Sequence, residues 1–141
     1  MHYYKILADN PDSNGNQIYK YAKFLLNKNC AAFDAVEGLK YLEKAADLRS
    51  EKAALRLGNI LYNGDFGVNV DKVKASQFYE IAADKNNAIA KCNLGLMLMN
   101  GDGIEMNKKR ALSLFANAAN QNNLTGIDNY LKLLNEGVQE K

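Results

Sequence analysis

The sequence predicts an all-α protein, a solenoid built from stacked pairs of antiparallel helices. Three observations lead to this fold class: an internal repeat of about 37 residues, amphipathic spacing typical of helices within each repeat, and weak strand signals throughout. Gly58 recurs as Gly95, and Gly64 recurs as Gly101, each 37 residues later (95 − 58 and 101 − 64). A period of this length is typical of helical repeat proteins, in which each unit is one pair of helices.

The repeat continues toward both ends of the chain. Ala75 recurs as Ala111, 36 residues later (111 − 75), because the loop of the earlier unit contains Phe66 as an extra residue. The segment "YYKILAD" from Tyr3 fits the second helix of a unit, and "YLKLLNEG" from Tyr130 fits the first helix of another. We therefore expect one domain over residues 1–141, with three full units between two half units. The expected boundaries are 3–9 for the first half unit, about 16–50, 51–87 and 88–123 for the full units, and 124–138 for the last half unit.

Each unit is expected to contain two amphipathic helices. In the first helix, apolar or small residues recur at three- and four-residue spacing, which places them on one buried face. In the second helix, small residues allow close backbone approach and aromatic residues fill the space to the next unit. The residues expected to be buried in the middle unit are Ala53, Ala54, Leu57, Gly58 and Leu61 of the first helix, and Ala75, Phe78, Tyr79, Ala82 and Ala83 of the second.

Side-chain N-caps are expected where the second helix of each unit begins. Asp34, Asp71 and Asn107 stand at equivalent positions, and their side-chain oxygens can accept hydrogen bonds from free amides of the first turn. Glu37, three residues after Asp34, makes a capping box possible.

The glycine-rich segments "NGDFG" and "NGDG" occur at the same point of successive units, just after a helical pattern ends. Glycine at this point supplies the left-handed conformation that terminates a helix. Neither segment has the spacing or the preceding strand of a phosphate-binding loop, and neither has the ligand order of an EF-hand. We therefore interpret both as connectors between helices.

Composition argues against several functional classes. The net charge is +2, and no basic run is longer than Lys108-Lys109-Arg110, so we expect no nucleic-acid or membrane partner. No apolar stretch is long enough to cross a membrane, and the first residues do not resemble a signal peptide, so a cytoplasmic location is expected. His2 is the only histidine and the two cysteines form no C-x-x-C pair, so we expect no metal, no cofactor and no catalytic centre.

These repeated positions resemble the Sel-one-like repeat family, a branch of the tetratricopeptide-type α-solenoids. The family's unit is approximately A-x3-L-G-x2-Y-x2-G-x-G-V-x2-D-x2-K-A-x6-A-A. The first full unit departs most, with Ala22 at the glycine position, Gly38 at an alanine position and no Gly-x-Gly. The middle unit matches at Ala53, Leu57, Gly58, Gly64, Gly67, Val68, Asp71, Lys74, Ala75, Ala82 and Ala83. The next unit matches at Ala90, Leu94, Gly95, Gly101, Gly103, Ile104, Ala111, Ala118 and Ala119.

The resemblance implies a right-handed superhelix that acts as a protein-binding adaptor through its concave face. Some members of this family have one disulfide in each repeat, but Cys30 and Cys92 do not occupy such paired positions and are expected to lie too far apart to bond. The main functional hypothesis is a non-enzymatic scaffold that holds a peptide or a partner helix. The alternative is a structural spacer in a larger repeat protein whose activity lies in another domain.

Candidate partner-binding residues lie opposite the buried stripe of each first helix. Basic and amide side chains predominate, which suits an acidic or extended peptide, while Leu96 and Ile89 offer apolar anchors. An inert surface is the alternative for the mid-helix positions, and helix termination is favoured for Asn63 and Asn100. The candidates are Lys20, Lys23, Lys52, Arg56, Asn59, Asn63, Ile89, Asn93, Leu96, Asn100, Asn129 and Lys132.

The helices at the two ends of the repeat look like ordinary internal helices. Solenoids usually need polar capping helices, because an open end exposes the apolar face that would contact another repeat. We therefore expect that the chain either belongs to a longer array or self-associates through its uncapped ends.

Overall fold

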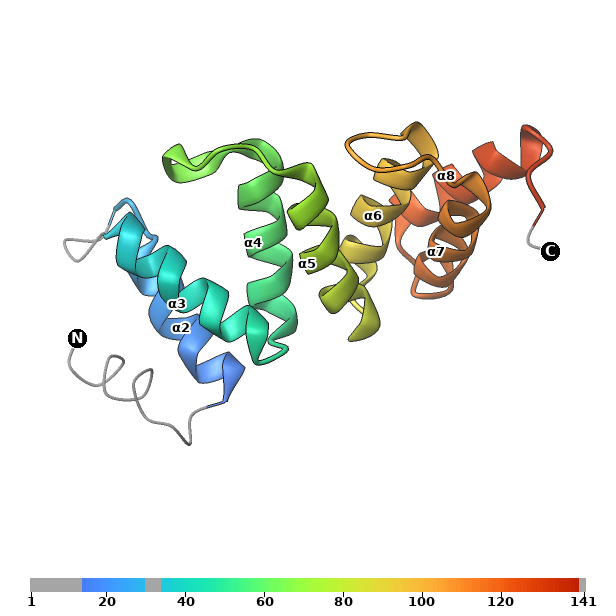
Figure 1. Cartoon of the computed structure of the whole chain (residues 1–141). Coiled ribbons are helices and arrows are strands. Elements are labelled where there is room, and N and C mark those ends of the chain that lie inside the picture. The colour runs from blue at the N-terminus through green and yellow to red at the C-terminus, as the bar shows by residue number, and fades with distance from the viewer. Residues whose placement is uncertain (1–13, 30–33, 140–141) are drawn as a thin grey trace.

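The computed structural model describes residues 14–29 and 34–139, and all described elements are helical (Figure 1). The all-α class is therefore confirmed. The half unit expected at 3–9, together with His2 and Cys30, lies outside the described residues. The helices are α2 (Gly15–Leu25), α3 (Ala35–Asp47), α4 (Glu51–Asn63), α5 (Lys72–Asp84), α6 (Ala88–Asn100), α7 (Lys108–Asn120) and α8 (Leu124–Asn135), with a short 3₁₀ turn, η1 (Asp65–Gly67).

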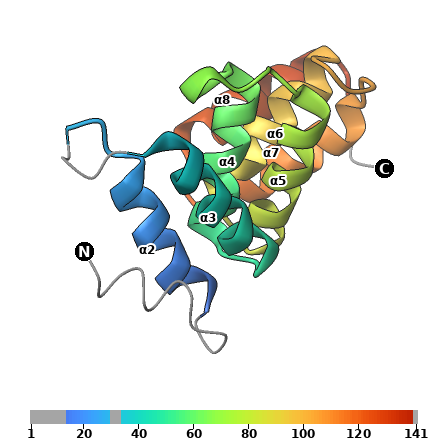
Figure 2. The ribbon, with the colours of Figure 1, turned by 60° about the vertical axis from the view of Figure 1, so that its left-hand side comes forward.

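Each helix packs mainly against the helices that precede and follow it in the sequence. The array therefore runs across the molecule from the N-terminal to the C-terminal side (Figure 1). In the turned view, the helices from α4 onward lie one behind another and α2 lies at one edge (Figure 2). We call α2, α4, α6 and α8 the A helices and α3, α5 and α7 the B helices. Contacts limited to neighbours are the defining property of a solenoid, so the predicted architecture is confirmed.

Every described α-helix begins at a polar side chain that accepts a hydrogen bond from an amide of the first turn. The caps predicted at Asp34, Asp71 and Asn107 are among them. The capping box predicted for Asp34 and Glu37 shows only the bond from the Glu37 amide to Asp34, whereas both bonds of a capping box form between Asn14 and Gln17. The seven caps are Asn14, Asp34, Ser50, Asp71, Asn87, Asn107 and Asn123.

The two glycine-rich segments connect A helices to B helices, as predicted. Gly64 and Gly101 have φ values of 75° and 64°, in the left-handed region, and end α4 and α6. The inserted residue Phe66 also has a positive φ, 57°, within η1, and its ring packs against the core. Lys28 Nζ lies 5.2 Å from the centroid of this ring. The insertion therefore adds an aromatic contact between the loop and the preceding unit.

The A and B helices of a unit approach closely at a glycine. A Cβ placed on Gly58 would lie 2.7 Å from the Tyr79 ring, and one on Gly95 would lie 2.8 Å from the Phe115 ring. The buried residues predicted for the second helix of the middle unit are all buried. In the first helix the prediction was wrong at one position: Ile60 is buried within the core cluster, whereas Leu61 is only partly buried, because it packs at the edge of that cluster.

Candidate functional site

The candidate site is the surface formed by α2, α4, α6 and the loops that follow α4 and α6, which we call the A face. Hollows lined by described residues lie on it, and those considered below have volumes of about 370, 460 and 300 Å³. The amide hollow, between α4 and α6, is lined by Asn59, Tyr62, Asn63, Tyr79, Asn93, Leu96, Met97, Asn100 and Asp102. The arginine hollow is lined by Lys28, Arg56, Asn59, Ile60, Asp65 and Phe66. The lysine hollow is lined by Asn16, Tyr19, Lys20, Lys23 and Lys52.

Asn59 organises the amide hollow. Its Oδ1 accepts a hydrogen bond of 2.6 Å from the Tyr79 hydroxyl and a longer one of 3.4 Å from Asn93 Nδ2. Burial raises the pKa of Tyr79 to about 12, so its hydroxyl remains a donor at neutral pH. Both bonds go to one oxygen, and Asn59 Nδ2 donates to no described residue. The Asn59 amide therefore retains two donors for a ligand.

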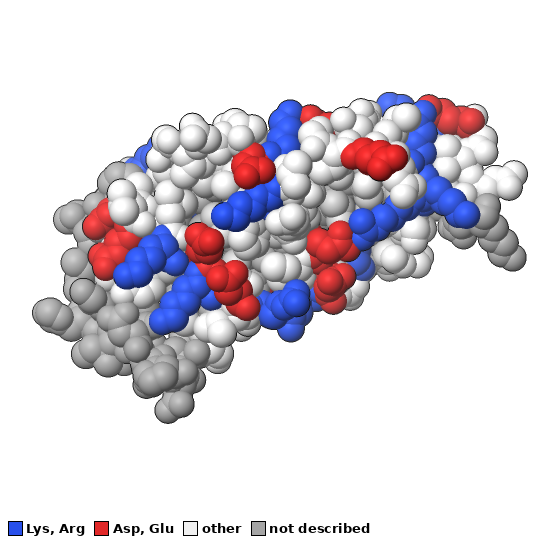
Figure 3. Space-filling model, in the orientation of Figure 1, with Lys and Arg blue, Asp and Glu red and all other residues white. Residues whose placement is uncertain are grey.

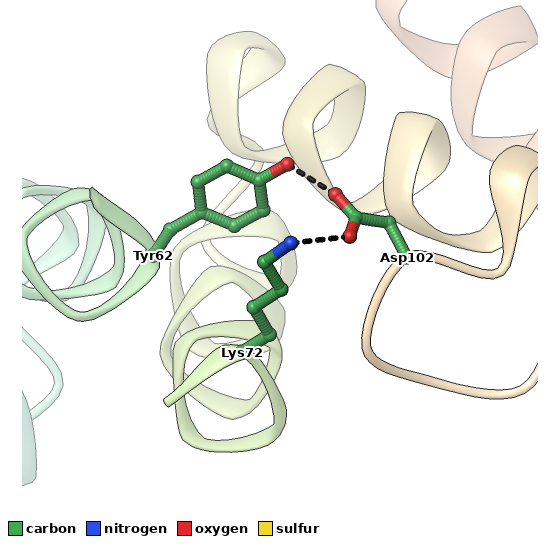
Figure 4. A network of polar contacts seen from close by, with 3 residues as sticks. All are labelled: Tyr62, Lys72 and Asp102. Carbon is green, nitrogen blue, oxygen red and sulfur yellow. Dashed lines mark hydrogen bonds and ion pairs between the residues drawn. The ribbon is translucent and has the colours of Figure 1, made fainter. Parts of the chain in front are cut away.

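A polar cluster of three residues, Tyr62, Lys72 and Asp102, lies beside the amide hollow (Figure 4). Two of them, Tyr62 and Asp102, line the hollow. Lys72 Nζ lies 2.6 Å from Asp102 Oδ1, and the Tyr62 hydroxyl donates to Asp102 Oδ2. The hydrogen bond from Lys72, reinforced by the one from Tyr62, lowers the pKa of Asp102, and the same contact raises the pKa of Lys72. The cluster joins the loop after α6 to α4 and α5 of the preceding unit.

Glycine is required beside this cluster. A Cβ on Gly103 would lie 2.4 Å from Lys72 Cβ, so a larger residue would push the loop away from α5. Gly103 also has a φ of 80°, a conformation that side chains disfavour. The second glycine of "NGDG" therefore positions Asp102 against Lys72.

Leu96 and Met97 supply the apolar part of the amide hollow. Met97 is buried, whereas Leu96 is partly buried and packs against the core with one side. Amide donors and acceptors beside an apolar surface suit a peptide bond and a neighbouring apolar side chain. Among the residues that the structure describes, no cluster of three or more histidine, cysteine or acidic side chains is arranged to hold a metal ion.

The lysine hollow differs in charge from the opposite side of the molecule. Lys20, Lys23 and Lys52 make no ion pair with any described residue. Elsewhere, acidic and basic side chains are interspersed (Figure 3), and two ion pairs join successive B helices: Lys74 with Glu43 and Arg110 with Glu80. Within the described ranges, no carboxylate neutralises the positive charge of the lysine hollow, which favours anions near it.

The structure brings most of the sequence-predicted residues together on the A face. Ile89 on α6 and Asn129 and Lys132 on α8 line none of the three hollows. The predicted partner-binding residues that line one of these hollows are Lys20, Lys23, Lys52, Arg56, Asn59, Asn63, Asn93, Leu96 and Asn100.

Sequence reasoning missed three polar residues of the amide hollow. Tyr79 was expected only as a core residue, yet its hydroxyl reaches Asn59. Tyr62 lies three residues after Asn59 on the same helix face, a spacing that identifies neighbours, so it was identifiable from the sequence. Asp102 was not, because its position depends on the fold of the loop.

Cys92 is buried and its Sγ lies 3.2 Å from Asn123 Oδ1. Burial raises the pKa of its thiol, which disfavours the reactive thiolate. The expected distance between Cys92 and Cys30 concerns a residue outside the described part of the chain.

The sequence-family model of the Sel1 repeat matches this chain over residues 30–50, 51–87 and 88–123. The protein therefore belongs to the Sel1 repeat family, the Sel-one-like family that the motif resembles. A comparison with curated proteins gave no match. No described helix has the length and apolar character required to cross a membrane.

Solved structures share the fold at low sequence identity. A Sel1 repeat protein from Oxalobacter formigenes is 24% identical, with a TM-score of 0.69 over 80% of this chain and 46% of its own. A protective antigen of uropathogenic Escherichia coli with an SLR fold is 23% identical, with a TM-score of 0.78 over 91% of this chain and 28% of its own. Cysteine rich protein B from Helicobacter pylori is 24% identical, with a TM-score of 0.65 over 84% of this chain and 98% of its own. This chain thus spans less than half the length of the first two.

Proposed function

We propose that this protein is a non-enzymatic protein-interaction module that binds an extended peptide or a partner helix along its A face. The observation that supports this most is the amide hollow, in which Asn59 is held by Tyr79 and Asn93 beside the apolar surface of Leu96. Side chains already fixed by hydrogen bonds lose little entropy when they bind a ligand.

Lysines that make no ion pair with any described residue give the proposed site a preference for acidic ligands. Lys20, Lys23 and Lys52 surround one hollow, and Arg56 lines the next, so acidic ligand residues are favoured toward the α2 end. The family assignment supports the class of function, because Sel1 repeats generally serve as protein-interaction modules.

The test is selection of binding peptides from a displayed library, followed by affinity measurements with two double variants. Lys52→Glu with Arg56→Glu reverses two charges on the A face. Lys85→Glu with Lys109→Glu reverses two exposed charges on B helices or their ends and is the matched control. We expect enrichment of acidic peptides, at least tenfold weaker binding by the first variant and a change below twofold for the control.

Equal losses in both variants would contradict binding on the A face. If no peptide is enriched above background, the spacer function becomes the better account of the chain.

A further inference from the structure

The amide hollow lies in the interior of the array, between two complete repeat units. Every residue that lines it lies between Asn59 and Asp102, so the lining belongs to the units over 51–87 and 88–123 and does not depend on either end of the chain. The volume of about 370 Å³ is within the usual range of small-ligand pockets, roughly 300–1,000 Å³. The chemistry of the lining therefore decides which group of a ligand this hollow can hold.

No basic residue is among the described residues that line the amide hollow, and Asp102 is the one acidic residue among them. Both oxygens of this carboxylate are already bonded: Oδ1 lies 2.6 Å from Lys72 Nζ, and Oδ2 accepts from the Tyr62 hydroxyl (Figure 4). A ligand carboxylate in the hollow would lie near Asp102 with no lining cation to pair with it, which is unfavourable. A ligand cation would compete with Lys72 for Asp102. An uncharged polar group meets neither obstacle.

Asn59 and Asn93 offer a donor and an acceptor to such a group. Asn59 Oδ1 accepts from the Tyr79 hydroxyl at 2.6 Å and from Asn93 Nδ2 at 3.4 Å, and Asn59 Nδ2 donates to no described residue. Because Tyr79 is buried and its hydroxyl needs an acceptor, it holds Asn59 in this orientation. No described residue donates to Asn93 Oδ1. A carboxamide has both an acceptor oxygen and a donor NH₂ group, whereas a carboxylate has acceptors only.

The apolar part of the hollow favours a longer side chain. Leu96 is partly buried and Met97 is buried, and both line the hollow together with the two asparagines. A glutamine side chain has two methylene groups to place against this surface, whereas an asparagine side chain has one. Burial of the additional methylene is favourable, so glutamine is the better fit of the two carboxamide residues.

We propose that the amide hollow binds the carboxamide of a glutamine side chain and discriminates against glutamate, which has nearly the same shape. This inference rests on the proposed function, because the glutamine belongs to the peptide that lies along the A face. Acidic residues of that peptide are expected at the lysine hollow, which is lined by Lys20, Lys23 and Lys52. The two hollows thus bind different residues of one ligand.

The experiment titrates the isotopically labelled full chain with two small probes, N-acetyl-glutamine methylamide and N-acetyl-glutamate methylamide. The probes have the same backbone amides and differ only in the carboxamide or carboxylate of the side chain, so binding through the backbone alone would give equal affinities. The side-chain amide signals of Asn59 and Asn93 report occupancy of the hollow. Titrations at neutral pH give the dissociation constant of each probe.

The wild-type chain is expected to bind the glutamine probe at least tenfold more tightly than the glutamate probe, with the largest shifts at Asn59 and Asn93. Asn59→Asp keeps an oxygen for the Tyr79 hydroxyl but removes the two donors, so it should weaken binding of the glutamine probe about tenfold. Asn117→Asp makes the same change at an exposed position of α7 and is the matched control, with an expected change below twofold. Circular dichroism establishes that each variant is folded.

Equal affinities for the two probes, tighter binding of the glutamate probe, or no binding of the glutamine probe would overturn the proposal. So would shifts of the glutamine probe that leave Asn59 and Asn93 unchanged. If library peptides bind the A face while the two probes do not differ, this inference is wrong and the proposed function stands. A preference for the glutamine probe without any enriched peptide would contradict the proposed function alone.

Discussion

The two sides of the array use polar residues differently. On the A face, Asn59 is held by a buried tyrosine through its oxygen, and Lys20, Lys23 and Lys52 have no carboxylate partner among the described residues. On the side of the B helices, exposed basic and acidic residues pair with each other between units. Units are joined on both sides, by Lys74–Glu43 and Arg110–Glu80 between B helices and by Lys72–Asp102 at the loop after α6, but the hollows of the A face also contain an amide nitrogen and lysines with no partner among the described residues.

Among the predicted changes in stability, the largest should come from disturbing the contact between an A helix and its B helix. Gly95→Leu inserts a side chain where a Cβ alone would lie 2.8 Å from the Phe115 ring, so we expect a loss of about 3 kcal/mol in the free energy of unfolding. Urea denaturation measures this loss of stability. Adding Phe115→Ala should restore part of the loss, since the two residues share one space. Strict additivity of the two changes would show that the contact does not determine the spacing of α6 and α7.

A pair of substitutions compares the two sides directly. Asn59→Ala leaves the buried Tyr79 hydroxyl without its acceptor and should cost about 1–2 kcal/mol. Glu80→Ala removes an exposed ion pair with Arg110 and should cost at most about 0.5 kcal/mol. Both are measured by urea denaturation at the same pH and salt concentration. Equal losses of stability in the two variants would contradict the proposed difference between the hydrogen bonds of the A face and the ion pairs of the B helices.

The turns that lead from a B helix to the next A helix offer a smaller, stabilising change. Arg49, Asn86 and Asn122 occupy equivalent positions with φ values of 66°, 71° and 62°. Asparagine tolerates this left-handed conformation better than arginine. Arg49→Asn should therefore stabilise the chain by about 0.5–1 kcal/mol, seen as a higher midpoint of thermal unfolding. A lower midpoint would show that Arg49 makes contacts that outweigh its backbone strain.

The smallest effect should appear as a change in pH dependence. The pKa of Asp102 is lowered in the folded state, chiefly by Lys72, so its stabilisation is complete above the ordinary value of about 3.9 and is lost as pH falls through the lower folded value. Stability curves between pH 2 and 7 should be flatter at the acidic end for Asp102→Asn than for the wild type. Identical curves would mean that the cluster in Figure 4 contributes nothing to folding.

Much of the fold was predictable because the period determines it. The N-caps at Asp34, Asp71 and Asn107 and the terminating glycines Gly64 and Gly101 depend on local chemistry that neighbouring sequence reveals. Burial of Ile60 in preference to Leu61 was not predictable, because it depends on packing between several helices and not on the spacing within α4.

The site was predictable only in part, for a physical reason. Helical spacing identifies residues of one helix that share a face, which is why Arg56, Asn59 and Asn63 were found. The contribution of Tyr79 and Asp102 depends on contacts between different elements, which no spacing within one helix reveals.

Binding of an extended peptide on the A face is tested most directly by mapping amide chemical shifts of the isotopically labelled chain during titration with a selected acidic peptide. We predict that the largest changes occur at the side-chain amides of Asn59 and Asn93 and at the backbone around Lys52 and Leu96. Changes concentrated on α3, α5 and α7, with those amides unmoved, would contradict the proposed function.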